Sequence, residues 1–202
     1  MHAQVDPVPG DAHSGPRPSG RPRAILVCGA PGSGKSTVGA LVARRLHAAL
    51  LDLDTATASL TAVISAIHGT DDLDDAELVR LTRAARYEAL SALAEDNLAV
   101  GVSVVLVAPF TTERRDPNAW DHLRRRMARS GGDACMVWLR IPAEEVVRRV
   151  ELRGAARDLA KLRSDWPAGL DLGPPAVPHL EVDALGSPAV IAEAVVSSVR
   201  SR

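Results

Sequence analysis

The nine residues "GAPGSGKST" at 29–37 constrain the fold of this 202-residue chain more than any other feature. Gly29, Gly34, Lys35 and Ser36 occupy the fixed positions of the pattern G-x-x-x-x-G-K-S/T. An unbroken apolar run, "AILVC", precedes the loop, and "VGALVARRLHAAL" follows it with helical spacing. A buried strand, a glycine-rich loop and a helix in this order predict a phosphate-binding P-loop.

The residue types of this loop explain the prediction. Glycines let the backbone wrap, so that consecutive N–H groups and the positive end of the following helix point at one phosphate. The Lys35 ammonium reaches the β- and γ-phosphates, and the Ser36 hydroxyl ligates Mg²⁺. No N-K-x-D motif for guanine occurs, which favours ATP. The predicted ATP-binding residues of the loop are Gly29, Pro31, Gly32, Ser33, Gly34, Lys35, Ser36 and Thr37.

The rest of the chain alternates short apolar runs with segments of helical spacing. The apolar runs that predict strands follow the first one at 49–54, 102–108, 134–141 and 179–184. The helical segments lie at 55–68, 75–96, 118–129 and 187–200, with a further helix opened by Pro142. This alternation predicts an α/β layer sandwich with a mostly parallel sheet. Residues 1–22, with five prolines and three glycines, predict a disordered tail before one domain at 23–202.

Charge and hydropathy exclude several classes of partner. The net charge is −1, so no global field points to nucleic acid or to a membrane surface. No apolar run reaches the roughly 18 residues of a membrane helix, and the first residues lack a secretory signal. Cys28 and Cys135 both lie in apolar runs and are expected to be reduced core residues. We therefore expect a cytoplasmic protein with neither a nucleic acid nor a membrane as partner.

Two carboxylates lie at the end of the second predicted strand. Asp52 and Asp54 alternate around Leu53, which on a strand places both on the same side of the chain. Ligands of open α/β sheets bind at such strand ends. One carboxylate would orient Mg²⁺ through water, and the other would accept the proton of an attacking hydroxyl. The alternative is a pair of solvated turn acids. The third strand ends in Ala108 and Pro109, where a motor ATPase would carry an aspartate.

Four stretches of the sequence resemble the small P-loop kinases, which include gluconate kinase, shikimate kinase, chloramphenicol phosphotransferase and adenylate kinase. They are 29–37, "DLD" at 52–54, "APFTTERRDPNAW" at 108–120 and "RRVELRGAARDLAKLRSDW" at 148–166. The chain is still more similar to actinobacterial AAA-type ATP-binding proteins. The resemblance implies that Asp54 is the base and that Asp52 holds a metal-bound water. The glycine triad of shikimate kinase is missing, so no acceptor follows from the resemblance.

Three arginines recur every four residues and share one face if the helix continues: Arg149, Arg153 and Arg157. The resemblance to adenylate kinase implies that Arg149 lies against adenine, that Arg153 contacts the phosphates and that Arg157 approaches from a lid hinged at Gly154. Guanidinium groups match the charge that develops on phosphoryl oxygens. The alternative is a solvated helix face paired with Glu144, Glu145 and Glu151.

The predicted acceptor site lies around the end of the third strand. Thr111, Arg114 and Arg115 follow that strand, and Tyr87 belongs to the helix expected to cover the acceptor. The two arginines are equally expected to bind an anionic or polyhydroxy substrate or to pair with Glu113 and Asp116. For the neighbouring helix residues Arg80, Arg83 and Arg86, the sequence favours a solvated face.

Together these features predict a P-loop kinase core with a five-stranded parallel sheet in the order 2-3-1-4-5 and a helical lid. The predicted activity transfers the γ-phosphoryl group of Mg·ATP to a hydroxyl of a small molecule, a metabolite or an antibiotic. Lys35, Asp54, Arg153 and Arg157 are its predicted catalytic residues, and Ser36 and Asp52 its metal ligands. The alternatives are a slow ATPase that acts as a switch on a protein partner, and a zeta-like toxin kinase that acts on a sugar nucleotide.

Overall fold

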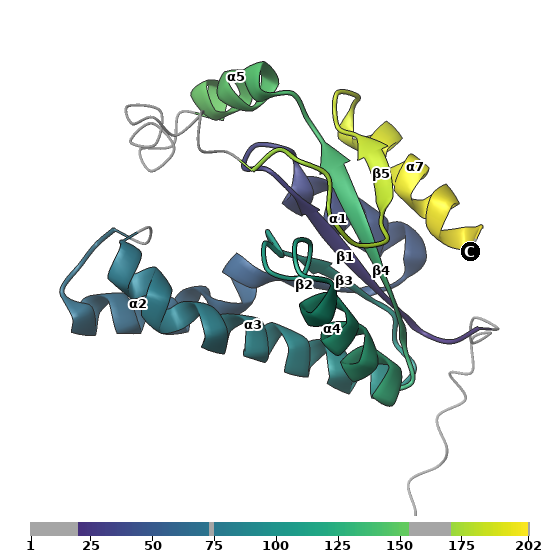
Figure 1. The fold of residues 1–202 in the computed structure, drawn as a ribbon, viewed down its shortest axis with the longest axis horizontal. Coiled ribbons are helices and arrows are strands. Elements are labelled where there is room, and N and C mark those ends of the chain that lie inside the picture. Colours follow the sequence, from purple (N-terminus) through teal and green to yellow (C-terminus); the bar gives the residue numbers. More distant parts are fainter. Residues whose placement is uncertain (1–19, 73–74, 154–170, 202) are drawn as a thin grey trace, which may run out of the picture.

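A five-stranded parallel sheet forms the centre of the molecule (Figure 1). The computed structural model describes residues 20–72, 75–153 and 171–201. The strand order is β2-β3-β1-β4-β5, which confirms the predicted order. All four pairings between neighbouring strands are parallel. The strands are β1 Arg23–Gly29, β2 Ala49–Asp52, β3 Val104–Val107, β4 Asp133–Arg140 and β5 Leu180–Asp183.

Helices cover both faces of this sheet (Figure 1). Helices α1 (Lys35–Leu46) and α7 (Pro188–Arg200) pack on each other over one face. Helices α3 (Ala76–Ala99) and α4 (Pro117–Arg129) cover the other. Alternate residues of β1 enter separate cores: Ile25 and Val27 face α1 and α7, whereas Leu26 faces α3 and α4. This burial on both faces explains the unbroken apolar run of β1.

Three helices begin directly after a residue whose side chain caps the helix. The Asp75 side chain accepts a hydrogen bond from the N–H of Leu78 at the start of α3. Asp116 precedes Pro117 at the start of α4, and Ser187 precedes Pro188 at the start of α7. Helix α5 spans Ala143–Arg153, directly after Pro142 as predicted. Most of the predicted tail 1–22, and the predicted connection 164–178 up to residue 170, lie outside the described residues.

Helix α2 (Leu53–His68) presents its apolar residues to solvent. The helical spacing of 55–68 predicts that Leu60, Val63, Ile64 and Ile67 share one side of the helix, but Leu60 is 70% exposed and Ile67 is 81% exposed. The residues buried against the neighbouring helix α3 are Leu53, Thr57, Thr61 and Ser65. The Thr57 hydroxyl donates to the Leu53 carbonyl at 2.6 Å, which satisfies it inside the helix pair. The apolar side of α2 is therefore not the side that packs against α3.

Gly39 allows α1 to approach β3 closely. A Cβ atom at this position would lie 2.4 Å from Cγ2 of Val107, a fully packed core residue. We expect Gly39→Ala to lower the free energy of unfolding by about 1–3 kcal/mol, because the gain in helix propensity does not offset overpacking. Urea unfolding followed by circular dichroism measures this. The exposed neighbour Ala40 is the control, and Ala40→Ser should change stability by less than about 0.5 kcal/mol. An unchanged midpoint in Gly39→Ala would contradict the close packing.

Candidate active site

The P-loop joins β1 to α1 through three glycines with positive φ. Gly32 and Gly34 have φ angles of 75° and 86°, a region that favours glycine. A Cβ on Gly29 would lie 2.8 Å from the Ser33 hydroxyl oxygen and 2.9 Å from the Leu139 carbonyl oxygen, so only glycine fits there. Gly34 is the N-cap of α1 and supplies no side chain to bond its first N–H groups. These N–H groups and the helix dipole fit a phosphate.

The polar side chains of the loop support the same ligand. The Lys35 ammonium donates to the Ala30 carbonyl at 2.8 Å and thereby lies across the loop. The Ser33 hydroxyl is buried, and no described group bonds it. Pro31 and Thr37 are exposed. The predicted P-loop residues therefore all lie between the last residue of β1 and the first turn of α1, around the N–H groups that would bind a phosphate.

Asp52 connects the end of β2 to the P-loop. Its Oδ2 accepts a hydrogen bond from the Ser36 hydroxyl at 2.8 Å, and its Oδ1 accepts from the N–H groups of Asp54 and Thr55. The carboxylate is thus fixed at the point where the Ser36 hydroxyl would ligate a metal. Mg²⁺ is usually bound by one or two protein oxygens together with substrate phosphates and water. The described residues hold no cluster of three or more His, Cys, Asp or Glu side chains for a metal, and this pair fits the Mg²⁺ pattern without one.

Asp54 lies in the first turn of α2, not on the strand. The predicted strand 49–54 is two residues too long, because the Asp52 carboxylate caps the helix from Leu53 onward. The prediction that Asp52 and Asp54 share a side through strand alternation is therefore wrong. Asp54 is 78% exposed in its side chain and pairs with Arg86 Nη2 at 2.5 Å. Arg86 also donates to the Thr57 hydroxyl at 2.8 Å.

The arginines of α3 are not all on a solvated face. Arg86 reaches Asp54, and Arg83 Nη2 donates to the Thr111 hydroxyl at 2.7 Å. Tyr87 accepts a hydrogen bond from the N–H of Phe110 at 3.2 Å, which ties α3 to the loop after β3. The sequence did not predict that Arg83 and Arg86 contact residues at this edge of the sheet. Their spacing of three residues, with Tyr87 one turn beyond Arg83, is the signal that could have found them.

Arg114 and Arg115 both pair with Asp171. Arg114 is 2% exposed, and it also donates to the Asp171 carbonyl at 2.9 Å. Arg115 bonds the Asp171 carboxylate at 2.7 Å. The alternative in which these arginines pair with Glu113 and Asp116 is not realised, because the acid is Asp171, 57 residues after Arg114 and 56 after Arg115. Arg114 is therefore buried in an ion pair that ties the loop after β3 to Asp171.

Helix α5 packs against the P-loop. Arg149 donates to the carbonyls of Gly32 at 3.5 Å and Ala184 at 2.7 Å, and to Glu145 at 2.6 Å. Arg148 and Arg149 hydrogen-bond Glu145 and lower its pKa to about 2. Arg149 thus makes the alternative ion pair with Glu145 and also lies beside the P-loop. Arg153 ends α5 and its side chain is not described, while Gly154 and Arg157 lie outside the described residues.

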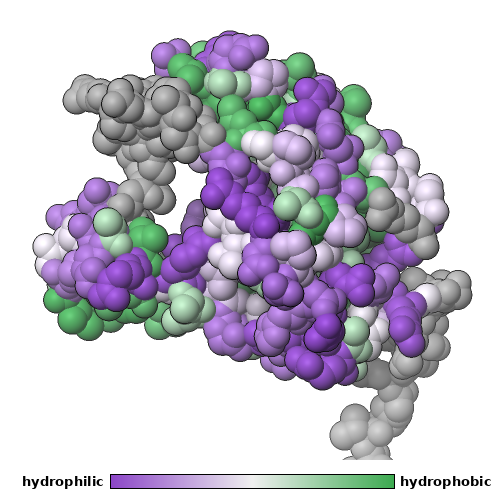
Figure 2. All heavy atoms as spheres, viewed as in Figure 1, coloured by the Kyte–Doolittle hydropathy of each residue, from purple (hydrophilic) through white to green (hydrophobic). Residues whose placement is uncertain are grey.

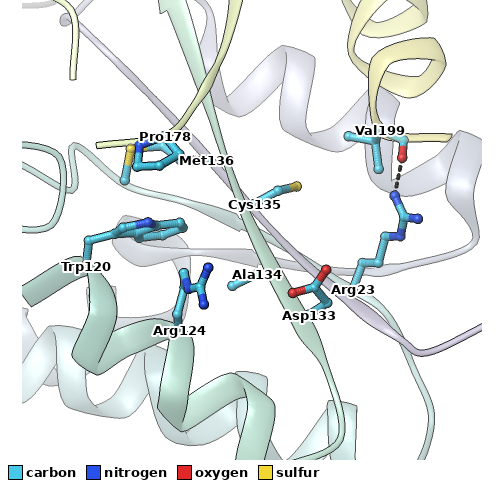
Figure 3. Close-up of a pocket in the computed structure, with 9 residues that line it drawn as sticks. All are labelled: Arg23, Trp120, Arg124, Asp133, Ala134, Cys135, Met136, Pro178 and Val199. Atoms are coloured by element: carbon cyan, nitrogen blue, oxygen red, sulfur yellow. Dashed lines mark hydrogen bonds between the residues drawn. The ribbon is translucent and has the colours of Figure 1, made fainter. Parts of the chain in front are cut away.

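A separate pocket lies at the opposite edge of the sheet. Its volume is about 190 Å³, and it is lined from the first residues of β1 and β4 and from α4 (Figure 3). Arg23, Arg124 and Asp133 are the charged residues of its lining, and the Arg23 guanidinium donates to the Val199 carbonyl. Strands begin at this edge, whereas the P-loop and Asp52 follow strand ends. The pocket is therefore not part of the site described above.

Cys28 and Cys135 do not form a disulfide bond. Burial raises the pKa of the Cys28 thiol to about 12, although Arg114 and Lys35 act in the opposite direction. Cys28 is thus a core thiol and not a nucleophile at neutral pH. No helix in the described part of the chain has the length and apolar character needed to cross a membrane.

Comparisons with known proteins agree with this geometry. A family profile described as an AAA domain matches residues 25–165. APS kinase of Mycobacterium tuberculosis, solved with AMPPNP and APS, superimposes with a TM-score of 0.62 at 23% identity over 89% of this chain and 98% of that one. A gluconokinase of Sinorhizobium meliloti gives a TM-score of 0.54 at 20% identity over 90% and 93%. No curated protein sequence gives a significant match.

A sugar kinase of a Janibacter species gives a TM-score of 0.55 at 20% identity, covering 89% of this chain and 95% of that one. At these identities the superpositions show a shared fold, and the family match extends over more than half of the chain. The chain belongs to the AAA domain family of P-loop proteins and has the α/β fold found in small P-loop kinases.

Proposed function

We propose that this protein transfers the γ-phosphoryl group of Mg·ATP to a hydroxyl of a small molecule. The observation that carries the proposal is the hydrogen bond between Ser36 and Asp52, with Asp54 two residues further along the chain. This hydrogen bond brings the Asp52 carboxylate, and with it Asp54, to the P-loop, so that groups suited to phosphate, Mg²⁺ and a proton lie at one edge of the sheet. Solved structures with the same fold are named as kinases of APS, gluconate and sugars, which supports this class of reaction.

Each residue of the site has a distinct task in this proposal. Lys35 and the N–H groups of α1 would bind the β- and γ-phosphates, and Ser36 and Asp52 would hold Mg²⁺. When bound, the metal neutralises charge on the transferring group. Asp54 would accept the hydroxyl proton of the acceptor after its exposed pair with Arg86 opens. Arg149 would lie against the adenine ring of ATP, and Arg153 and Arg157 would stabilise the phosphoryl oxygens.

The acceptor would enter between α2 and the P-loop side of the domain. Figure 2 shows the surface hollowed beside the α2 lobe, with hydrophilic residues along the inner wall. Tyr87 on α3 and Thr111 in the loop after β3 are joined to each other's elements by hydrogen bonds, through Phe110 and Arg83, and we propose them with Arg115 as acceptor contacts. We infer that the acceptor is a small molecule, a metabolite or an antibiotic, and not a nucleic acid. The ATP supply of the cytoplasm suits the same activity.

The test is transfer of label from γ-³²P-labelled ATP with Mg²⁺ into a fractionated extract of small metabolites and a panel of antibiotics. We expect a labelled small molecule with the active protein and none after EDTA removes Mg²⁺. Release of free phosphate alone, with no labelled acceptor, would contradict the kinase and favour the slow ATPase switch. The absence of an acid at Ala108 and Pro109, after β3, is the feature that favours that second candidate. Growth arrest on expression would instead indicate a toxin kinase.

A further inference from the structure

Arg83 is held at the ligand edge of the sheet by neutral groups. Its Nη2 donates to the Thr111 hydroxyl at 2.7 Å, and its guanidinium carbon lies 4.8 Å from the centre of the Tyr87 ring. The Tyr87 ring in turn contacts Phe110 edge-to-face at 5.9 Å, and its hydroxyl accepts from the Phe110 N–H. These contacts fix a half-buried guanidinium between α3 and the loop after β3. A guanidinium fixed in advance loses less entropy when it binds a ligand.

The charge of Arg83 is not balanced by a carboxylate in contact with it. The other described arginines at this edge each pair with an acid, namely Arg86, Arg114, Arg115 and Arg149. Among the described residues, no carboxylate lies within 4.0 Å of the Arg83 nitrogens. Glu113 is the nearby acid: burial raises the pKa of its carboxyl and the charge of Arg83 lowers it, but its carboxylate makes no ion pair with Arg83. A fixed cation with neutral partners is the usual composition of an anion receptor.

The strand order places this cation beside the reacting groups. Strand β3 lies between β2 and β1, so Thr111 follows the strand between the one that ends in Asp52 and the one that enters the P-loop. Arg83 and Arg86 lie one turn apart on α3, and Arg86 contacts Asp54. An acceptor whose hydroxyl faces Asp54 therefore has Arg83 within the reach of a small molecule.

The geometry points to an acceptor that carries an anionic group, a carboxylate or a phosphate, in addition to its reacting hydroxyl. Arg83 binds that group, with Thr111 as a second donor, and makes it the specificity-determining residue of the acceptor site. This inference rests on the proposed kinase function. It assigns to Arg83 the contact with an anionic substrate that the sequence predicted, as one of two alternatives, for Arg114 and Arg115.

The first experiment separates the metabolite extract on an anion-exchange column at pH 8 before the labelling reaction. We expect labelled product from the retained, anionic fractions, and phosphatase treatment of these fractions beforehand distinguishes phosphate from carboxylate acceptors. Label only from the unretained fraction would overturn the anionic acceptor while leaving the kinase standing. Label from no fraction would overturn the kinase proposal and the inference with it.

The second experiment measures KM for the acceptor found in this way. Arg83→Met should raise it by about 10- to 100-fold, the range expected for losing a hydrogen-bonded charge, with KM for ATP unchanged and kcat much less affected. Arg83→Lys, which keeps the charge without the fork, should lose less. The control is Arg80→Met, because Arg80 lies on the same helix and is exposed and paired with Glu77. Equal effects of Arg80→Met and Arg83→Met, or an equal rise in KM for ATP, would overturn the assignment.

Discussion

Lys35→Ala is expected to lower phosphoryl transfer by about 10²–10³-fold or more, because it removes a cation aimed at charge that develops on the transferring group. In the structure the Lys35 ammonium bonds the Ala30 carbonyl and lies across the P-loop, where the phosphates would bind. The backbone nest formed by Gly32 and Gly34 does not depend on this side chain. The fold should therefore survive the substitution, and the loss should appear in catalysis and in nucleotide affinity.

Three measurements check this expectation. Label transfer gives the rate, displacement of a fluorescent ATP analogue gives the affinity, and thermal unfolding reports the fold. The control is Arg44→Ala, because Arg44 is an exposed cation in the last turn of the same helix α1. It should keep full activity. A Lys35→Ala protein with more than half of the wild-type rate would mean that the P-loop does not bind the reacting phosphates.

The sequence predicted the P-loop and the sheet because both depend on local patterns. Glycines at positive φ, the apolar run of β1 and the capping residues of α3, α4 and α7 are determined within a few neighbouring residues. The end of β2 was predicted two residues too late. There the Asp52 side chain starts the helix α2, so strand alternation stops at that residue.

The acceptor side was harder to predict because it depends on tertiary pairing. Arg114 forms an ion pair with Asp171, and Arg86 forms one with Asp54, 32 residues earlier in the chain. Nothing in the spacing of "ERRDP" distinguishes Asp171 from Asp116 as a partner. The face of α3 that meets the loop after β3 depends on how α3 lies across the sheet. The sequence therefore indicated which residues lie near the end of β3 but not which acids pair with the arginines there.

Asp54→Asn is expected to lower phosphoryl transfer by about 10²–10⁴-fold, the contribution of a positioned general base, and to leave ATP binding intact. Asparagine keeps the shape of the side chain but cannot accept the proton. The exposed pair with Arg86 is lost too, but such a pair contributes only about 0–1 kcal/mol to stability. The control is Asp96→Asn, an exposed acid on α3 that should keep full activity.

The comparison with Asp52→Asn decides which of the two carboxylates is the base. Asp52 accepts from the Ser36 hydroxyl and caps α2, so its loss should raise the Mg²⁺ concentration needed for half of the maximal rate. Asp54 makes no contact of this kind, so Asp54→Asn should lower the rate at every Mg²⁺ concentration without shifting that midpoint. Titration of both variants with Mg²⁺ at saturating ATP measures the difference. If Asp54→Asn shifts the midpoint and Asp52→Asn does not, the assigned roles must be exchanged, because the loss of a carboxylate that holds the metal raises the Mg²⁺ concentration needed for activity.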